Sequence, residues 1–150
     1  MKINYRKCFN KNGELIEGLL IIKPEIIFDE RGFFQESWNK KNFEMVLYEN
    51  GQEDGSFVQD NHSKSVKGTL RGLHFQKNPY AQGKLVRCLR GEIYDVAVDL
   101  RKSSKTFLSY AVVNLSSNNQ TQFWIPKGFA HGFLTLTDYA EVFYLSLIHI

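Results

Sequence analysis

The sequence predicts a mainly β protein, built as a sandwich or barrel of short antiparallel strands. Aromatic residues make up 14% of the chain, with twelve Phe and seven Tyr, and such rings suit the pleated surface of a sheet. From residue 58 onward, short apolar segments alternate with turn residues, which is typical of sandwiches and barrels. The clearest alternation covers residues 93–100, where Tyr94, Val96 and Val98 share one face and Asp95 and Asp99 the other.

The first half of the chain predicts two strands and one helix. The expected elements are a strand over residues 19–23 that Pro24 closes, a turn over 29–32, a strand over 33–38, a helix over 39–47 and an exposed loop over 48–55. The helix prediction rests on Phe43, Val46 and Leu47, whose spacing places them on one side of a helix. No other segment has a comparable helical spacing, so the remaining structure is expected to be β.

The second half predicts strands over residues 84–89, 93–100, 107–115, 121–125, 132–136 and 141–145. The first two flank Arg90 and Gly91, a favourable turn sequence, and we expect them to form a hairpin.

Composition limits the class of protein. The chain has 150 residues, 43% hydrophobic and 23% charged, which suits one globular soluble domain. The net charge is +3 without a block of like charges, so nucleic-acid binding is disfavoured and a small anionic ligand is acceptable. Cys8 and Cys88 lack metal-ligand spacing and predict free thiols in a reducing cytoplasm. The first seven residues lack a signal-peptide core and no 18-residue apolar run occurs, so we expect no membrane segment.

One group of polar residues surrounds His74, in a segment that otherwise resembles a strand. A regular strand would point Arg71 and His74 to opposite faces, whereas a bulge at Gly72 would bring them to one side. The sequence of this segment alone leaves three roles open for His74: a structural histidine, a general base or a metal ligand. Cupin metal sites use two histidines one residue apart, and Gly72 and Gln76 occupy those positions here. No local signal therefore supports a metal site.

Two further groups carry candidate chemistry. His131 lies between Gly128 and Gly132, which predicts either an exposed histidine in a turn or an anion contact near a cleft. Tyr144 shares a strand face with Val142, so it is either a core residue with its hydroxyl at the rim or a general acid. Among the basic residues Arg31, Arg71 and Lys84, Arg71 lies within a strand-like segment and is expected to have a partner.

Taken together, these segments resemble the dTDP-4-dehydrorhamnose 3,5-epimerase family. The matching stretches are residues 29–36, 59–63, 68–76, 81–87, 94–101 and 126–133, and their order and spacing fit from about residue 17 to 145. The resemblance implies a cupin-type double-stranded β-helix, or jelly roll, that uses neither cofactor nor metal. It also implies a homodimer with exchanged N-terminal strands, acting on a dTDP-sugar.

The resemblance further implies roles for individual residues. They are His74 as the catalytic base, Tyr144 as the acid on the opposite side of the sugar ring, Lys84 facing the C4 oxygen, Arg31, Arg71 and His131 at the diphosphate, and Phe34, Glu36 and Gln59 at the nucleoside, some of them reaching across the dimer. Asn61 and Asp95 match pocket positions. The implied reaction epimerises C3 and C5 of dTDP-4-dehydro-6-deoxy-D-glucose through an enolate and yields dTDP-4-dehydro-L-rhamnose.

The match weakens after about residue 145, because the residues from 146 to 150 do not resemble the family. Family members continue further and carry an aspartate that hydrogen-bonds the catalytic histidine. We therefore expect one domain over residues 1–150, truncated at its C-terminus, with impaired turnover unless Asp95 or Asp99 takes over that contact. The alternatives are a mono-epimerase of a related nucleotide sugar and a non-catalytic module that binds a sugar nucleotide. A 3,4-ketoisomerase and a metal-dependent cupin oxygenase are disfavoured.

Overall fold

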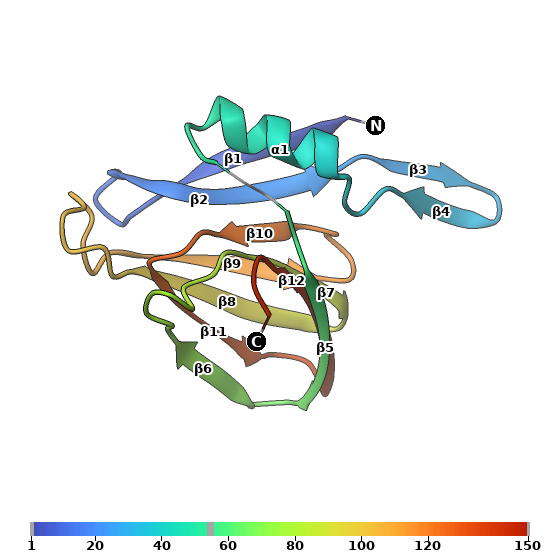
Figure 1. Ribbon diagram of the computed structural model, residues 1–150. Coiled ribbons are helices and arrows are strands. Elements are labelled where there is room, and N and C mark those ends of the chain that lie inside the picture. Colours follow the sequence, from blue (N-terminus) through green and yellow to red (C-terminus); the bar gives the residue numbers. More distant parts are fainter. Residues whose placement is uncertain (1, 54–55, 150) are drawn as a thin grey trace.

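In the computed structural model, which describes residues 2–53 and 56–149, two antiparallel sheets pack face to face (Figure 1). The strands are β1 (Ile3–Phe9), β2 (Leu15–Pro24), β3 (Ile26–Asp29), β4 (Gly32–Gln35), β5 (Gln59–Val66), β6 (Leu70–His74), β7 (Lys84–Arg90), β8 (Glu92–Asp99), β9 (Tyr110–Ser116), β10 (Gln122–Ile125), β11 (Phe129–Thr135) and β12 (Tyr139–Ser146), and the helix is α1 (Lys40–Glu49). The six-stranded sheet has the order β1-β2-β10-β7-β12-β5, and the four-stranded sheet has the order β6-β11-β8-β9.

Successive strands from β5 to β12 mostly alternate between the two sheets, as in a jelly roll. The predicted fold class is therefore confirmed, and so are the strands expected over residues 121–125 and 141–145. The strand expected over residues 132–136 also forms, but begins earlier, at Phe129. The strand expected over 107–115 starts only at Tyr110, because the preceding residues make turns.

The hairpin predicted for residues 84–100 is wrong. β7 pairs with β10 and β12, whereas β8 pairs with β11 and β9. Between them, Gly91 has φ +76°, and a Cβ there would collide with Thr137 Oγ1 and the carbonyl oxygen of Tyr139. The chain thus turns a corner instead of folding back. The physical reason is burial, because Val86 on β7 and Ile93 on β8 face each other's sheets across the core.

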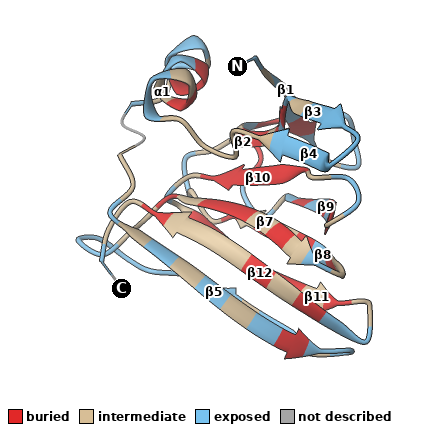
Figure 2. Ribbon diagram, turned by 90° about the vertical axis from the view of Figure 1, so that its right-hand side faces the viewer, coloured by how far each residue is buried: buried red, intermediate tan, exposed pale blue. Residues whose placement is uncertain are grey.

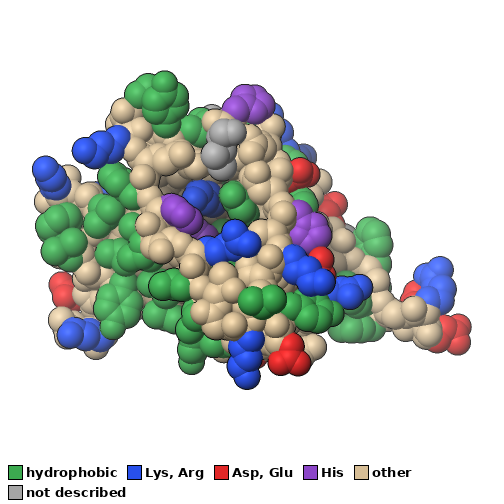
Figure 3. Space-filling view, turned by 90° about the horizontal axis from the view of Figure 1, so that it is seen from below, with side chains coloured by type: hydrophobic (Ala, Val, Ile, Leu, Met, Phe, Trp, Pro, Cys, Tyr) green, Lys and Arg blue, Asp and Glu red, His purple; other side chains and the backbone are tan. Residues whose placement is uncertain are grey.

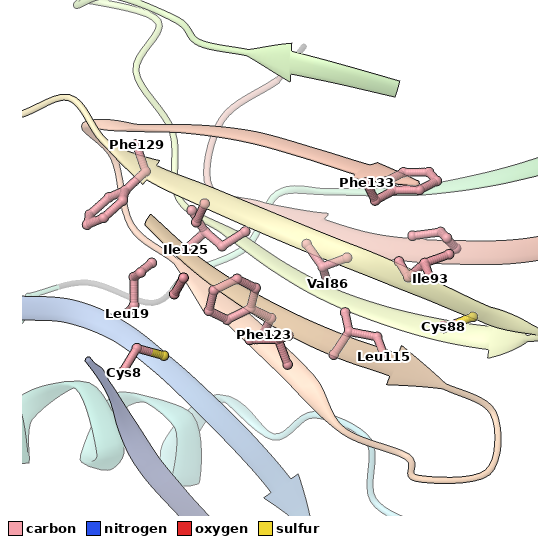
Figure 4. Close-up of a cluster of buried hydrophobic side chains, with 14 of the residues drawn as sticks. Cys8, Leu19, Val86, Cys88, Ile93, Leu115, Phe123, Ile125, Phe129 and Phe133 are labelled. Atoms are coloured by element: carbon pink, nitrogen blue, oxygen red, sulfur yellow. The ribbon is translucent and has the colours of Figure 1, made fainter. Parts of the chain in front are cut away.

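The apolar core lies between the two sheets (Figure 4). Val86, Ile93, Leu115 and Phe123 are fully buried there, and burying such a side chain contributes about 1.5–3 kcal/mol relative to leaving it exposed. Figure 2 shows how burial follows the layers. β10 is buried along its whole length, while β5, at the edge of the same sheet, alternates between buried or half-buried and exposed residues.

α1 covers part of the outer face of the six-stranded sheet. Its buried residues are Phe43, Val46 and Leu47, as predicted, and they pack in one cluster with Leu85 and Trp124 of the sheet. Asn39 caps the helix, since its side chain accepts a hydrogen bond from the backbone N–H of Asn42 at 3.1 Å. The helix continues two residues past the predicted end, because its last turn is solvated and leaves no apolar pattern. Residues 54 and 55 of the expected loop lie outside the described residues.

β3 and β4 form a separate hairpin that projects from the body of the protein (Figure 1). The strand expected over residues 33–38 ends at Gln35, because Trp38 turns back to pack on the cluster beneath α1. Four large apolar side chains of the hairpin are exposed: Ile27, Phe28, Phe33 and Phe34. A two-stranded hairpin is marginally stable alone in water, so this arm presents an apolar surface without a covering layer.

Within the described ranges, no helix has the length and apolar character needed to cross a bilayer.

Candidate active site

A cavity of about 470 Å³ lies between the two sheets. His74 and His131 line it from the four-stranded sheet, and Lys84 and Tyr144 line it from the six-stranded sheet. The remaining lining residues are Leu73, Phe75, Gln76, Gln82, Ile125, Gly128 and Phe129. Figure 3, which views the protein from below, shows a hollow in which histidine and basic side chains gather. The structure thus brings together four residues that the sequence singled out at distant positions.

His74 and Tyr144 reach this cavity from opposite sheets. Tyr144 follows Val142 by two positions on β12, so both side chains point inward from the six-stranded sheet. His74 is the last residue of β6 and lies opposite His131 in the four-stranded sheet, so the two histidines share a face. A ligand in the cavity is therefore approached by an imidazole on one side and a phenol on the other.

Of the two alternatives left open for the segment around Gly72, a regular strand and a bulge, the structure shows the bulge. Along β11 two steps separate His131 from Phe133, while their partners His74 and Arg71 are three steps apart on β6. The extra residue puts Arg71 on the same side as His74. Gly72 has φ +107°, and a Cβ there would lie only 2.6 Å from the carbonyl oxygen of His131. Glycine is thus the residue that this close approach of the strands requires.

Arg71 has the partner that its position predicted, but it lies outside the cavity lining. Its Nε donates to Ser65 Oγ at 2.7 Å and its Nη2 donates to the carbonyl oxygen of Lys64 at 3.3 Å.

Lys84 is the first residue of β7, and its ammonium nitrogen is 5.7 Å from the centroid of the Tyr144 ring. Burial lowers the pKa of Lys84, and the charge of Asp95 opposes that shift. A desolvated ammonium of this kind exerts a strong field on any oxygen placed in the cavity.

His131 is buried on β11, so the prediction of an exposed histidine in a turn is wrong. Its Nε2 lies 2.8 and 3.0 Å from the two carboxyl oxygens of Asp95. Asp95 is fully buried on β8, the strand next to β11. Burial raises the pKa of Asp95, and His131 and then Lys84 oppose that rise. The turn ends at Gly128, so His131 is the third residue of a strand and faces inward.

Asp95 and Asp99, the two residues considered as replacements for the family's aspartate, make no contact with His74. Asp95 pairs with His131, and Asp99 binds Arg101, Ser104 and Thr106. The reason is topological, because β11 lies between β8 and β6 and separates the two aspartates from His74.

Gln59 and Asn61 lie beside Tyr144. β5 pairs with β12, with Asn61 opposite Tyr144 and Gln59 opposite Ser146. Gln59 donates to the Asn61 side chain at 2.7 Å, and Asn61 in turn donates to the carbonyl oxygen of Tyr144 at 3.5 Å. These amides extend the polar surface of the inner face next to the cavity.

Arg31, Phe34 and Glu36 lie elsewhere, on or next to the projecting hairpin. The Arg31 side chain is 87% exposed and pairs with Asp29 at the hairpin tip, and Phe34 is exposed. Glu36 accepts a hydrogen bond from Asn42 of α1 at 3.3 Å. Within one chain, none of the three lines the cavity.

Sequence reasoning did not single out Gln76, Gln82 or Phe129 as site residues. Gln82 donates to Gln76 at 2.9 Å, and this pair lies on the segment that joins β6 to β7 along the cavity. All three lie in stretches that match the family, residues 68–76, 81–87 and 126–133. They carry no titratable group, whereas the residues predicted from these stretches are all titratable. Among the described residues, no three His, Cys, Asp or Glu side chains converge as metal ligands.

With this geometry in place, comparison with known proteins is decisive. The family model for dTDP-4-dehydrorhamnose 3,5-epimerase matches residues 14–147. The chain belongs to this family. Its members are isomerases, and its known structures share the cupin-type fold found here.

Individual relatives support the assignment to the dTDP-4-dehydrorhamnose 3,5-epimerase family. The dTDP-4-dehydrorhamnose 3,5-epimerase of Shigella flexneri is 59% identical over 129 residues, covering 86% of this chain and 69% of that relative. The crystal structure of the Elizabethkingia anophelis enzyme of the same name matches with a TM-score of 0.88 and 44% identity, covering 100% of this chain and 76% of the other. The Legionella pneumophila dTDP-6-deoxy-D-glucose-3,5-epimerase, solved with dTDP-4-keto-L-rhamnose, has a TM-score of 0.87 and 48% identity, covering 99% and 73%.

Proposed function

We propose that this protein epimerises C3 and C5 of dTDP-4-dehydro-6-deoxy-D-glucose, giving dTDP-4-dehydro-L-rhamnose. The observation that carries the proposal is the placement of His74 and Tyr144 on opposite sheets around one cavity that also holds Lys84. Inversion of a carbon requires a proton to leave from one face and return to the other, and this arrangement supplies one group for each face. Membership of the epimerase family supports the same reaction.

The proposed chemistry follows from the position of the ketone. C3 and C5 both flank the C4 carbonyl, so a proton on either carbon is acidic enough for the His74 imidazole to remove. The electron pair moves into the C4 oxygen to form an enolate, which the Lys84 ammonium stabilises in a partly desolvated site. The Tyr144 hydroxyl then gives its proton to the opposite face of the carbon. The proposal assigns no step to a cofactor or a metal.

We place the dTDP portion along the polar surface beyond these groups. His131 contacts the diphosphate from within the cavity, and Arg71 contributes Nη1, which makes no bond among the described residues. Gln59 and Asn61 contact the nucleoside from β5. The dTDP-sugar bound to the Legionella pneumophila enzyme supports this class of substrate.

Arg31, Phe34 and Glu36 complete the proposed site from a second copy of the chain. They lie away from the cavity of their own chain, around an arm whose apolar residues are exposed. In a homodimer the arm would cover its apolar surface and carry these residues to the partner's nucleotide. Sedimentation equilibrium should therefore give a dimer, and Phe34→Ser with Phe28→Ser should shift the equilibrium toward monomer. A monomeric unmodified protein would contradict this part of the proposal.

We also place the protein in the cytoplasm, which agrees with Cys8 and Cys88 being buried free thiols.

The proposed reaction is tested by proton NMR of dTDP-4-dehydro-6-deoxy-D-glucose in D₂O with the purified protein. Loss of the C3 and C5 proton signals, with appearance of the L-rhamnose configuration, is the expected result. Exchange at one carbon would instead identify a mono-epimerase. The matched variant is His74→Asn, which removes the base at an exposed position and should slow exchange about 10²–10⁴-fold without lowering the melting temperature. Binding of dTDP without any exchange, in the protein and its variant alike, would favour a binding module.

A further inference from the structure

Asp95 is a buried charge at the cavity that the proposed mechanism does not use. It is fully buried on β8 and does not line the cavity itself. Its one hydrogen-bonding side chain among the described residues is His131, which reaches both carboxyl oxygens. Burying an ionised carboxylate is costly unless its partners are well placed. The presence of an aspartate at a buried position with so few donors therefore needs an explanation.

The surroundings of Asp95 supply that explanation. Three titratable groups from two neighbouring strands interact with it: His131 on β11, and Lys84 and Cys88 on β7. Lys84 in turn lines the cavity beside Tyr144 on its own sheet and opposite His74 on the other sheet. Two groups that line the cavity, His131 and Lys84, thus interact with one carboxylate behind it.

We infer that Asp95 is a positioning residue that fixes the ring of His131 through Nε2 and keeps Lys84 in its ammonium form. This inference rests on the proposed function for its consequence in turnover, although the interaction itself can be measured without substrate.

An ionised Asp95 has two effects on its neighbours. An ionised carboxylate only accepts hydrogen bonds, so Nε2 of His131 carries a proton and the ring cannot rotate without losing both contacts. Burial disfavours the charged form of Lys84 and lowers its pKa, and the Asp95 charge opposes this. Without Asp95, Lys84 would lose its proton at a lower pH, and a neutral amine stabilises an enolate poorly.

The direct test is the titration of Lys84 in the protein and in Asp95→Asn. Lysines are dimethylated with ¹³C-formaldehyde, and the Lys84 signal is identified by its absence from Lys84→Arg. We expect the midpoint of Lys84 to move to lower pH in Asp95→Asn. An unchanged midpoint would overturn the inference, whether or not the protein turns over its substrate.

The matched control is Asp99→Asn, since Asp99 is equally buried and lies on the same strand and face. Its loss should lower stability without moving the Lys84 midpoint. Equal shifts in both variants would mean that loosening of β8, not the charge of Asp95, moves the Lys84 signal, and would also refute the inference.

A second variant covers the case in which Asp95→Asn does not fold. In Lys84→Met, the carboxyl ¹³C signal of Asp95 should titrate at higher pH than in the unmodified protein, because Lys84 opposes the rise of the Asp95 pKa. No movement of that signal would show that the two groups are not coupled.

The consequence for turnover is read from kcat/KM against pH, followed by exchange in D₂O. Asp95→Asn should lower kcat/KM about 10–100-fold. This magnitude is taken by analogy from metal sites, where removing the partner that orients a histidine ligand causes such a loss. The substitution should also move the alkaline limb of the profile to lower pH. A uniform loss with an unmoved limb would indicate a purely structural residue. Absence of exchange in the unmodified protein would instead count against the proposed function and leave the titration of Lys84 to decide this inference.

Discussion

The middle and the C-terminal end of β8 hold two aspartates, Asp95 and Asp99, that differ in their surroundings. Asp95 and Asp99 lie on the same face of the strand, and both are fully buried. Asp99 accepts hydrogen bonds from Arg101 Nε at 2.9 Å and Nη2 at 3.0 Å, from Ser104 Oγ at 2.6 Å and from Thr106 Oγ1 at 2.8 Å. Within the part of the chain that the structure describes, Asp95 has one hydrogen-bonding side chain, the imidazole of His131.

The balance between burial and hydrogen-bond donors sets the sign of each pKa shift. Burial acts to raise the pKa of Asp99, but the bonds from Arg101, Ser104 and Thr106 outweigh it and hold the pKa below its ordinary value. Burial prevails at Asp95 and leaves its pKa raised. A carboxylate saturated with donors stabilises the fold, whereas one with few donors leaves its field to act on neighbouring charges, here those at the cavity.

The Asp99 network also supports the cavity indirectly. Arg101 lies over the ring of Phe129 at 4.7 Å from its centroid, and Phe129 is part of the cavity lining. The structural end of β8 thus orders a wall of the site without contributing a charge to it.

The largest effect on stability is expected for Asp99→Asn. The substitution replaces an acceptor oxygen with an NH₂ group that faces existing donors, and leaves Arg101 without its counter-ion. Breaking a buried pair costs about 3–5 kcal/mol, and we expect the lower limit, about 3 kcal/mol, because the Arg101 side chain is 31% exposed. Urea denaturation measures the difference in the free energy of unfolding. A loss as small as that of a surface substitution would show that the network does not stabilise the fold.

A pH series sharpens the contrast between the two aspartates. The pKa of folded Asp99 lies below its ordinary value of 3.8, so its stabilisation is complete above that pH and is lost as pH falls through the folded pKa. The gap in stability between the protein and Asp99→Asn should therefore narrow only below about pH 4.

Asp95 should behave oppositely in the same series. Its folded pKa lies above the ordinary value, so its ionisation costs stability as pH rises from that value through the folded pKa. The protein should lose stability relative to Asp95→Asn across that interval. Parallel curves of stability against pH for the two variants would contradict the opposite pKa shifts of Asp95 and Asp99.

The smallest effect is expected for Asp29→Asn. Asp29 and Arg31 repeat the local geometry of Asp99 and Arg101, since the backbone N–H of Arg31 donates to Asp29 Oδ1 at 2.9 Å and that of Arg101 to Asp99 Oδ1 at 3.0 Å. The Arg31 side chain is 87% exposed, and exposed pairs contribute little because water screens them. Thermal unfolding should give an unchanged midpoint. A marked decrease would mean that the pairing itself, and not burial, accounts for the stabilisation at Asp99.

The sequence by itself determined the fold class, the helix near residue 39, most strands and the family, because these depend on side-chain periodicity and on matching stretches. It also indicated where a bulge could occur, at Gly72, but the choice between a bulge and a regular strand came from the pairing with β11. Only the tertiary structure decided that β7 and β8 belong to different sheets, because local alternation is the same in a hairpin and in a strand pair that turns a corner. Likewise, only the tertiary structure showed that the polar face of β8 points inward and that Asp95 pairs with His131. Alternation defines two faces, but which face is buried depends on the layer that packs against it.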